Sequence, residues 1–420
     1  MYLLRLAIKS LANRRFSAIL TVLAIALSVT LLLAVEKVRT EARASFTSTI
    51  AGTDLVVGAR SGSVQLLLYS VFRIGNATNN IRWDSYQHVT EHPQVAWAIP
   101  LSLGDSHRGF RVMGTTPGYF EHYRHGRDQA LVFASGAQFD DLYDAVLGAD
   151  VARELGYALT DEMVLAHGTG SVSFVDHADK PFRVSGILRK TGTPVDRTIH
   201  ISLQGIEALH VDWQQGMPGR GAASVSAEQA REMDLTPKAI TAVLLGLTSR
   251  ISTFAVQREI NQFGGEPLQA VLPGVALQEL WSLLGMAEKA LFIVSLFVVL
   301  TGLVGMLTAI LSSLNERRRE MAILRSVGAR PRHVFSLLLL EAASLAFAGI
   351  MIGLGLMYLC LWLAQPLILS RYGLYIAITP PGPYEWTLLG AILAASVLMG
   401  SVPAWRAYRQ SLADGLSIRT

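Results

Sequence analysis

Cysteine and charge are both scarce in this sequence. A single cysteine, Cys360, occurs among 420 residues, and only 16% of the residues are charged, against 51% that are hydrophobic. One cysteine excludes a disulfide framework within the chain and a cysteine-based metal site. So little charge with so many apolar residues excludes an ordinary soluble enzyme, in which roughly a quarter of the residues are charged.

A phosphate-binding loop is also missing. The pattern G-x-x-x-x-G-K-[ST], in which backbone N–H groups and a lysine hold the phosphates of a nucleotide, occurs nowhere in the sequence. The chain therefore cannot hydrolyse ATP by that route. We expect a protein that is not an enzyme, with no catalytic residues and no cofactor of its own.

What the sequence does have is four apolar runs, each long enough to cross a hydrocarbon core of about 30 Å. We expect transmembrane helices at residues 17–35, 290–314, 334–363 and 386–402. A cleaved signal peptide is the alternative for the first run, but no convincing cleavage site follows it. The four runs together predict a multi-pass membrane protein.

Basic residues gather beside these runs in three places. They lie in residues 1–16, which we expect to form an amphipathic helix on the inner membrane surface, in a loop at 315–333 and in a tail at 403–420. Short basic segments stay on the cytoplasmic side of a membrane. We therefore expect both termini in the cytoplasm, and residues 36–289 and a short loop at 364–385 outside it. This charge distribution indicates topology and not nucleic-acid binding.

Residues 36–289 read as a folded domain between two helical stalks. β-rich runs and short helices alternate along it. The clearest are a strand at 52–58, a helix at 83–91, a helix at 147–156 that a glycine closes, and strands at 182–188 and 198–203. Residues 214–236 look like a mobile insertion. The predicted fold class is an α-helical membrane bundle of four transmembrane helices with a large extracytoplasmic α/β (α+β) domain inserted between the first two.

The loop at 315–333 has more structure than a passive connection needs. Apolar side chains recur along it at near-helical spacing, as a stripe made of Met321, Ile323, Leu324 and Val327. Gly328 follows the last of them, which is the usual place for a glycine that ends a helix. A short helix with an apolar stripe indicates a docking element. A solvated loop that obeys the positive-inside rule is the alternative, but it explains only the arginines.

The same segment resembles a known family. Asn315-Glu316-Arg317-Arg318-Arg319-Glu320-Met321-Ala322-Ile323-Leu324-Arg325-Ser326-Val327-Gly328-Ala329 is similar to the loop after the second membrane helix in MacB/FtsX-type ABC transporter permeases, which include the lipoprotein-releasing LolC and LolE proteins. The pieces of residues 36–289 resemble the MacB-like periplasmic core domain, so the resemblance covers nearly the whole chain. The missing phosphate-binding loop matches family members whose ATPase is a separate chain, and departs from MacB, where the ATPase is fused.

The resemblance implies a function and partners. The chain would be the permease subunit, acting in the bacterial inner membrane as a homodimer, or as a heterodimer with a similar permease. Two ATPase subunits would carry the ATP and Mg and would pass motion to the extracytoplasmic domain, for export or extraction of a periplasmic, lipoprotein or hydrophobic substrate. The coupling contacts would come from Glu316, Arg317, Arg318, Glu320, Met321, Ile323, Leu324, Val327 and Gly328. The alternative is an FtsX-like regulator, without transport, of a periplasmic enzyme or sensor. A periplasmic protein, lipoprotein or adaptor is a further expected partner.

Two features inside the predicted membrane helices are candidates for function. Glu341 is the acidic residue within an apolar run, close to its inner end, where it could serve function or simply reach headgroups or a cytoplasmic arginine. Gly349 and Gly353 form a G-x-x-x-G pattern that permits close approach of helices, so they are a possible dimer face.

Histidines offer only weak metal candidates. His88 and His92 fit the H-x-x-E-H pattern of zinc peptidases, but Pro93 follows at once and the ordinary interpretation is the end of a helix. His122 and His125 could also bind a divalent metal, although histidines at this spacing on a surface usually bind none. We predict no metal site.

Overall fold

The structure is a computed structural model with two compact units. The helical unit comprises described residues within Met1–Glu41, Gly285–Leu367 and Ile376–Thr420, and the α/β unit those within Ala42–Leu284 and Ile368–Tyr375. The residues that the structure describes are 14–126, 128–167, 175–176, 179–214, 217–218, 225–316, 321, 323, 325–372, 376 and 378–409.

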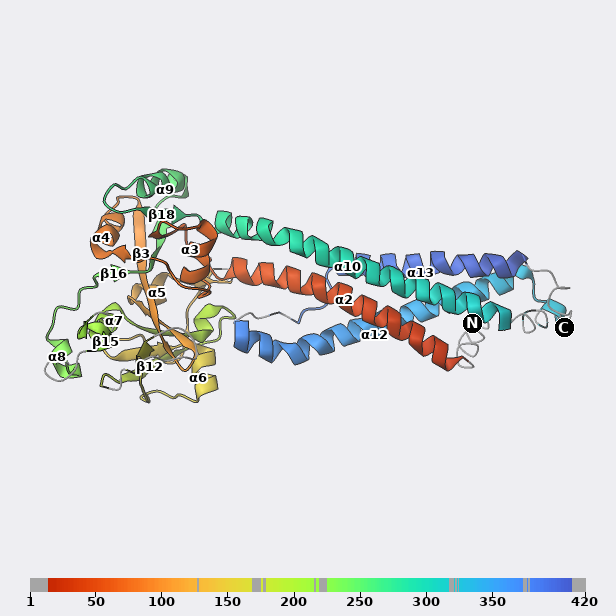
Figure 1. The fold of residues 1–420 in the computed structure, drawn as a ribbon, viewed down its shortest axis with the longest axis horizontal. Helices are drawn as coiled ribbons and strands as arrows, with labels where there is room; N and C mark the ends of the chain where they lie inside the picture. Colours follow the sequence, from red (N-terminus) through yellow and green to blue (C-terminus); the bar gives the residue numbers. More distant parts are fainter. Residues whose placement is uncertain are drawn as a thin grey trace. The chain divides into compact units, whose positions relative to one another are not determined.

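The helical unit is built from long helices. They are α2 (Arg15–Ser48), α10 (Pro273–Glu316), α12 (Pro331–Tyr372) and α13 (Pro383–Arg409), and within the unit they run alongside one another (Figure 1). Each contains a segment long and apolar enough to cross a membrane. The described residues thus contain four candidate membrane spans, at Arg15–Ala44, Pro273–Leu314, Pro331–Ile368 and Pro383–Arg409.

These helices extend beyond the apolar runs in the sequence. Hydropathy marks only the stretch that a membrane requires, whereas backbone hydrogen bonds continue a helix into neighbouring polar residues. α12 continues through Pro366, and α13 continues through Pro403 to Arg409. A proline inside a helix removes one N–H donor, a loss that helices packed in a bundle tolerate. Residues that the sequence suggested as loop or tail are therefore partly helical.

The α/β unit is organised around one mixed sheet. The sheet has 12 strands within the described residues. Its main order is β18 (Leu268–Val271), β1 (Leu55–Ala59), β17 (Ala242–Leu247), β3 (Val95–His107), β4 (Phe110–Thr115), β13 (Thr198–Ser202), β8 (Asp144–Leu147), β12 (Phe182–Leu188) and β7 (Phe133–Gly136). Off this path, β9 (Glu162–Met163) pairs with β12, and β10 (Ala166–His167) pairs with β3 and with β11 (Val175–Asp176).

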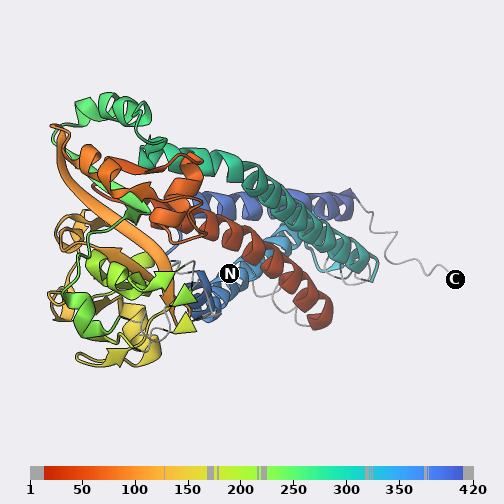
Figure 2. The same ribbon diagram turned by 60° about the vertical axis from the view of Figure 1, so that its left-hand side comes forward.

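Strand β3 joins the two halves of this sheet. Its first half pairs with β17, with Leu101 opposite Ala242, and its second half pairs with β4, with Ser102 opposite Gly114. Figure 2 shows β3 as the long, curved orange strand. Most neighbours are antiparallel, but β13 pairs in parallel with β4, and β12 with β8. The parallel pairs require crossover connections, which the helices of the unit supply.

Short helices cover the sheet. They are α3 (Ser63–Ser70), α4 (Trp83–Thr90), α5 (Gly118–His122), α6 (Ala149–Leu155), α7 (Leu203–His210), α8 (Ala227–Arg231) and α9 (Thr253–Asn261), with the 3-10 turns η1 (Pro194–Arg197) and η3 (Arg250–Ser252). Three two-strand pairs join β14 (Trp213–Gln214) to β15 (Met217–Pro218), β16 (Ala239–Ile240) to β2 (Ile81–Arg82), and β5 (Arg124–His125) to β6 (Gln129–Ala130).

Local sequence explains where some of these elements end. The predicted glycine end of the helix at 147–156 is confirmed, because Gly156 follows α6 with φ at +72°. Within the predicted mobile insertion at 214–236, residues 227–231 form α8, whereas residues 215–216 and 219–224 lie outside the described residues. Ser226 and Gln229 cap this helix reciprocally, each side chain bonding the backbone N–H of the other. Because these two backbone N–H groups have hydrogen-bond partners, the five-residue helix is stabilised without a long apolar face.

The core of the α/β unit divides into clusters on the faces of the sheet. The cluster that matters for the site contains Leu66, Met113, Tyr119 and Tyr123, all of them buried, and Leu277 from the start of α10 also joins it. Strands β1, β8 and β13 are buried at every residue because both faces of the sheet are covered there.

Candidate functional site

The segment between α10 and α12 ends a helix where the sequence predicts. The backbone is helical at residues 321, 323, 325 and 326. Gly328 then takes a φ of +101° and donates its N–H to the carbonyl of Arg325 at 3.1 Å. Only glycine adopts this conformation without strain, and the helix cannot continue through it. The predicted helix end at Gly328 is confirmed.

The apolar stripe of this segment divides between buried and exposed side chains. Met321 is 9% exposed and packs within the helical unit, whereas Ile323 is 51% and Val327 84% exposed. Glu316 is the last residue of α10. Arg317, Arg318, Glu320 and Leu324 lie outside the described residues, so their predicted coupling roles stay predictions. Two large apolar side chains are thus displayed on a segment whose end is fixed by Gly328.

The G-x-x-x-G face of α12 packs against α2 of the same chain. A Cβ added at Gly349 would lie 2.6 Å from Cγ2 of Ile25, and one at Gly353 would lie 2.6 Å from the carbonyl oxygen of Ala26. Thr30 Oγ1 donates to the carbonyl of Gly353 at 2.9 Å. This packing corrects the hypothesis of a dimer face, because α2 fills the space that these glycines leave.

Buried polar groups of α2 make two further contacts in the helical unit. Ser28 Oγ lies 2.7 Å from the carbonyl of Ala24 on its own helix and 3.1 Å from that of Val298 on α10, so its one hydroxyl proton is shared between α2 and α10. Lys37, whose side chain is 5% exposed, pairs with Glu41 at 3.1 Å and also donates to the hydroxyl of Thr379. Glu341 is 4% exposed on α12, so this intramembrane candidate is enclosed by protein and does not face lipid.

The metal candidates have other partners. His88 stacks on Phe263, with ring centroids 4.5 Å apart, and His92 Nε2 lies 3.2 Å from Glu259. His122 stacks on Trp97. His125 is 7% exposed in β5, and burial lowers its pKa. Among the described residues no group of three potential ligands is arranged to hold a metal ion.

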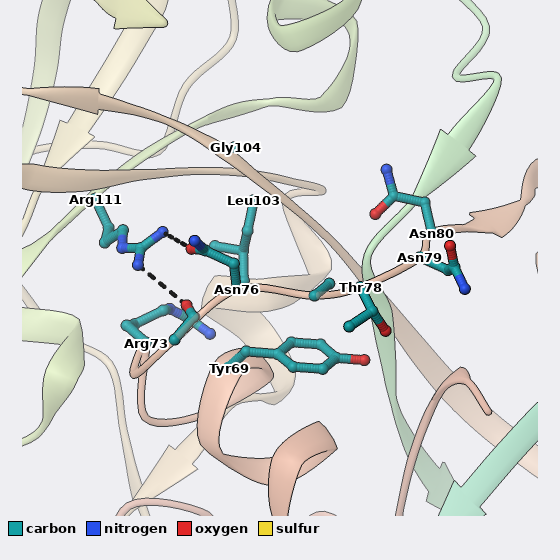
Figure 3. A pocket seen from close by; sticks show the side chains of 11 residues that line it. Tyr69, Arg73, Asn76, Thr78, Asn79, Asn80, Leu103, Gly104 and Arg111 are labelled. Carbon is teal, nitrogen blue, oxygen red and sulfur yellow. Dashed lines mark hydrogen bonds between the residues drawn. The ribbon is translucent and has the colours of Figure 1, made fainter. Parts of the chain in front are cut away.

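A cavity that the sequence does not reveal lies in the α/β unit, between the loop after α3 and strands β3 and β4. Its volume is about 270 Å³. Figure 3 shows the side chains that line it. We call it the arginine cavity and define it by its lining residues: Tyr69, Arg73, Gly75, Asn76, Ala77, Thr78, Asn79, Asn80, Leu103, Gly104 and Arg111. Two of them are arginines, several are amides or hydroxyls, and none is acidic.

Arg111 is held in a fixed position at the arginine cavity. Its Nη1 donates to Oδ1 of Asn76 at 2.9 Å and its Nη2 to the carbonyl of Gly75 at 3.0 Å, as Figure 3 shows. Both acceptors belong to the loop that follows α3, so this arginine from β4 also anchors the loop. Burial, and next the positive charge of Arg73, lowers the pKa of Arg111.

Arg73 is the unusual residue of the arginine cavity. Its φ is +59°, a left-handed conformation that costs a non-glycine residue about 1 kcal/mol or more. Nη2 lies 2.6 Å from Sδ of Met113 and the hydroxyl of Tyr119 lies beside the guanidinium, while Nε and Nη1 are buried and form no hydrogen bond of good geometry. Burial lowers the pKa of this guanidinium. A buried cation with unsatisfied donors makes the free energy of folding less favourable. Such a residue is therefore a candidate for a role in binding.

The aromatic and imidazole groups around Arg73 are held neutral. Burial raises the pKa of Tyr119 to about 12, and also raises that of Tyr123. Burial, and then the charge of Arg73, lowers the pKa of His200 to about 3. None of these three groups supplies the negative charge that Arg73 lacks. One feature of the sequence could have drawn attention to this site. Turn-forming amide residues are concentrated in the loop Arg73-Ile74-Gly75-Asn76-Ala77-Thr78-Asn79-Asn80.

These features place the chain in a class and then in a family. Four membrane-length helices with an α/β domain between the first two define a multi-pass membrane protein. The family described as "MacB-like periplasmic core domain" matches residues 18–263, and that described as "FtsX-like permease C-terminal" matches residues 292–412. The chain belongs to the MacB/FtsX-type ABC transporter permease family.

Individual relatives are more distant. The macrolide export ATP-binding/permease protein MacB of Syntrophobacter fumaroxidans is 28% identical over 182 residues, which are 40% of this chain and 24% of that protein. The match therefore spans about a quarter of the relative's length. Among solved structures, the periplasmic region of MacB from Actinobacillus actinomycetemcomitans has a TM-score of 0.33 and 9% identity, over 55% of this chain and 94% of that one. The extracellular domain of the transporter YknZ from Gram-positive bacteria has a TM-score of 0.31 and 11% identity, over 52% and 99% respectively.

Proposed function

We propose that this chain is the permease subunit of an ABC transporter and couples ATP hydrolysis on a separate ATPase to motion of its α/β unit. The termini and the segment 315–333 would face the cytoplasm, and the α/β unit would lie on the other side of the membrane. Two ATPase subunits would bind the ATP and Mg, and two permease chains would form the membrane part. A periplasmic, lipoprotein or hydrophobic substrate fits the family.

The observation that carries this proposal is the exposure of Ile323 and Val327. Full burial of an exposed side chain of this kind contributes roughly 1.5–3 kcal/mol, so Val327 at 84% exposed can supply most of that free energy of binding and Ile323 at 51% about half. Gly328 fixes the end of the helical segment that presents them. A docked ATPase that moves would therefore move this segment, and α12 begins three residues later at Pro331.

Unbroken helices support the transmission of that motion. α10 runs without interruption from Pro273 to Glu316, which at about 1.5 Å per residue is a rod of roughly 65 Å. α2 is likewise continuous from Arg15 to Ser48. A hydrogen-bonded helix resists compression and bending, so displacement at one end reaches the other end.

The test replaces Val327 by aspartate in the full chain. On docking the new charge would be desolvated at a cost of several kcal/mol, so ATPase activity that co-purifies with the chain from native membranes should fall at least tenfold. Ile251→Asp is the matched control, since Ile251 is 93% exposed in the α/β unit. Both variants should accumulate in the membrane like the wild type. Undiminished ATPase activity with Val327→Asp would contradict the docking role.

A further inference from the structure

We propose that the arginine cavity of the α/β unit binds a phosphate group. This ligand site lies within the α/β unit and is independent of any coupling to an ATPase. Two arginines and the amide side chains of the loop after α3 line it, and the space that they enclose is small.

The charge of the cavity points to an anion. Arg73 and Arg111 line it together, and each lowers the free energy of a negative group placed between them. None of the lining residues is acidic. In the part of the chain that the structure describes, neither arginine takes part in an ion pair with an Asp or Glu. Two like charges held at one cavity repel each other, and an anion between them removes that repulsion.

The unsatisfied donors of Arg73 point to the same conclusion independently. The neutral hydroxyl of Tyr119 lies beside this guanidinium, but Nε and Nη1 are removed from solvent and form no hydrogen bond of good geometry, although a guanidinium carries five N–H donors in a fixed fork. Buried donors of this kind are normally satisfied. Because Nε and Nη1 do not face the cavity as it stands, Arg73 would rotate toward a bound anion, and this rotation would give the unpaired donors partners. The backbone of Arg73 is also held at a φ of +59°, which the loop maintains against the preference of the residue.

A phosphate fits these donors better than a single carboxylate does. A phosphate monoester carries close to two negative charges at neutral pH and several acceptor oxygens, which match two guanidinium groups. Arg111 uses two of its N–H groups on Asn76 and Gly75, and the others stay available. Figure 3 shows Asn79 and Asn80 on the opposite side of the cavity from the two arginines, so their amides would contact a group attached to the phosphate and not the phosphate itself. A monocarboxylate would leave one positive charge uncompensated.

The size of the cavity limits what can carry the phosphate. About 270 Å³ is below the usual range of roughly 300–1,000 Å³ for sites that enclose a whole organic ligand. The phosphate with a small attached group can enter, and anything larger must extend outward. Inorganic phosphate, a small phosphate ester and the headgroup of a lipid such as phosphatidic acid share this chemistry.

The experiment measures phosphate binding to the full chain purified in detergent. Isothermal titration with inorganic phosphate should give saturable binding with one site per chain. Arg111→Met should weaken it at least tenfold, because it removes one of the two charges and keeps the apolar stem. Arg258→Met is the matched control, since Arg258 is exposed on α9 and does not line the cavity, and it should bind like the wild type. Acetate should bind at least tenfold more weakly than phosphate.

A second variant and a second arm complete the test. Arg73→Met should also abolish phosphate binding, yet in the absence of phosphate its Tm should equal or exceed that of the wild type, because an unpartnered buried cation has been removed. Phosphate binding is also measured in nanodiscs that contain phosphatidic acid and in nanodiscs of phosphatidylcholine alone. Weaker phosphate binding in the presence of phosphatidic acid would show that the lipid headgroup occupies the site. Absence of saturable binding in both arms, equal binding of acetate, or unchanged affinity of Arg111→Met would overturn the proposal.

Discussion

Thr30 and Gly353 are 323 positions apart in the chain, and the Thr30 hydroxyl shares its proton between the carbonyl of Gly353 at 2.9 Å and that of Ala26 on its own helix at 2.8 Å. The contact exists because Gly353 has no side chain, which lets α2 approach α12 closely. Apolar helices gain little hydrophobic free energy from each other in a membrane, so close packing and such hydrogen bonds stabilise their association.

Gly353→Ala should destabilise the helical unit. The new Cβ would lie 2.6 Å from the backbone oxygen of Ala26, and backbone cannot move aside as a flexible side chain can. We expect a loss of roughly 1–3 kcal/mol and a lower Tm in detergent. Gly355→Ala is the matched control two residues along, where nothing lies within 4 Å. Both variants gain the same helix propensity, so their difference measures packing. Equal Tm values would show that the close contact is unimportant.

His200 should make the α/β unit sensitive to acid. Its Nδ1–H donates to the carbonyl of Val146 at 3.2 Å, Nε2 is buried without a partner, and burial lowers the pKa to about 3. The unfolded chain, with a histidine pKa of about 6.5, binds the proton more readily. Stability is therefore fully present above about pH 6.5 and declines as the pH falls towards 3, by about 2 kcal/mol between pH 7 and 5.

Thermal unfolding at several pH values checks this expectation. His200→Phe keeps an aromatic ring of similar size but cannot take up a proton, so its Tm should depend less on pH over this range than that of the wild type. The comparison matters because other groups also titrate there. Parallel Tm curves for the two proteins would count against protonation of His200 as a cause of acid sensitivity.

The buried pair of Lys180 and Asp212 should show strong coupling. Their side chains are 1% and 5% exposed, with Nζ 3.0 Å from Oδ1. Burial alone would raise the pKa of Asp212, but the hydrogen bonds from Lys180 and from the N–H of Val225 outweigh it, and the pKa is lowered. Lys180→Met leaves the carboxylate without its partner and should cost about 3–5 kcal/mol.

A double-mutant cycle measures this coupling. Lys180→Met with Asp212→Leu removes both charges, so it should cost clearly less than the sum of the two single variants. Chemical denaturation of the full chain in detergent gives the four free energies of unfolding. Additive effects would mean that the two charges do not stabilise each other.

Local patterns were enough to predict a large part of this protein. Apolar run length indicated the four membrane helices, and a glycine after an apolar stripe indicated the helix end at Gly328. Alternation and turn residues indicated strands such as β12 and β13. These features depend on each residue and its near neighbours, because hydropathy, periodicity and capping act over one or two turns.

Contacts between distant residues could not be predicted in this way. The register of β3 against β4, together with the turn at Gly75, brings Arg111 to the loop that contains Arg73. Neither arginine has a neighbour in the sequence that reveals the other.

The sequence by itself determined the membrane class, the inserted domain and the two glycine-terminated helix ends at Gly156 and Gly328, because each follows from local composition and backbone preference. Only the tertiary structure decided that α2 covers Gly349 and Gly353, and that two arginines share one cavity. The physical reason is that packing is selected by the fit of surfaces far apart in the chain. A G-x-x-x-G pattern indicates that another helix packs closely at this face, but it does not indicate which helix.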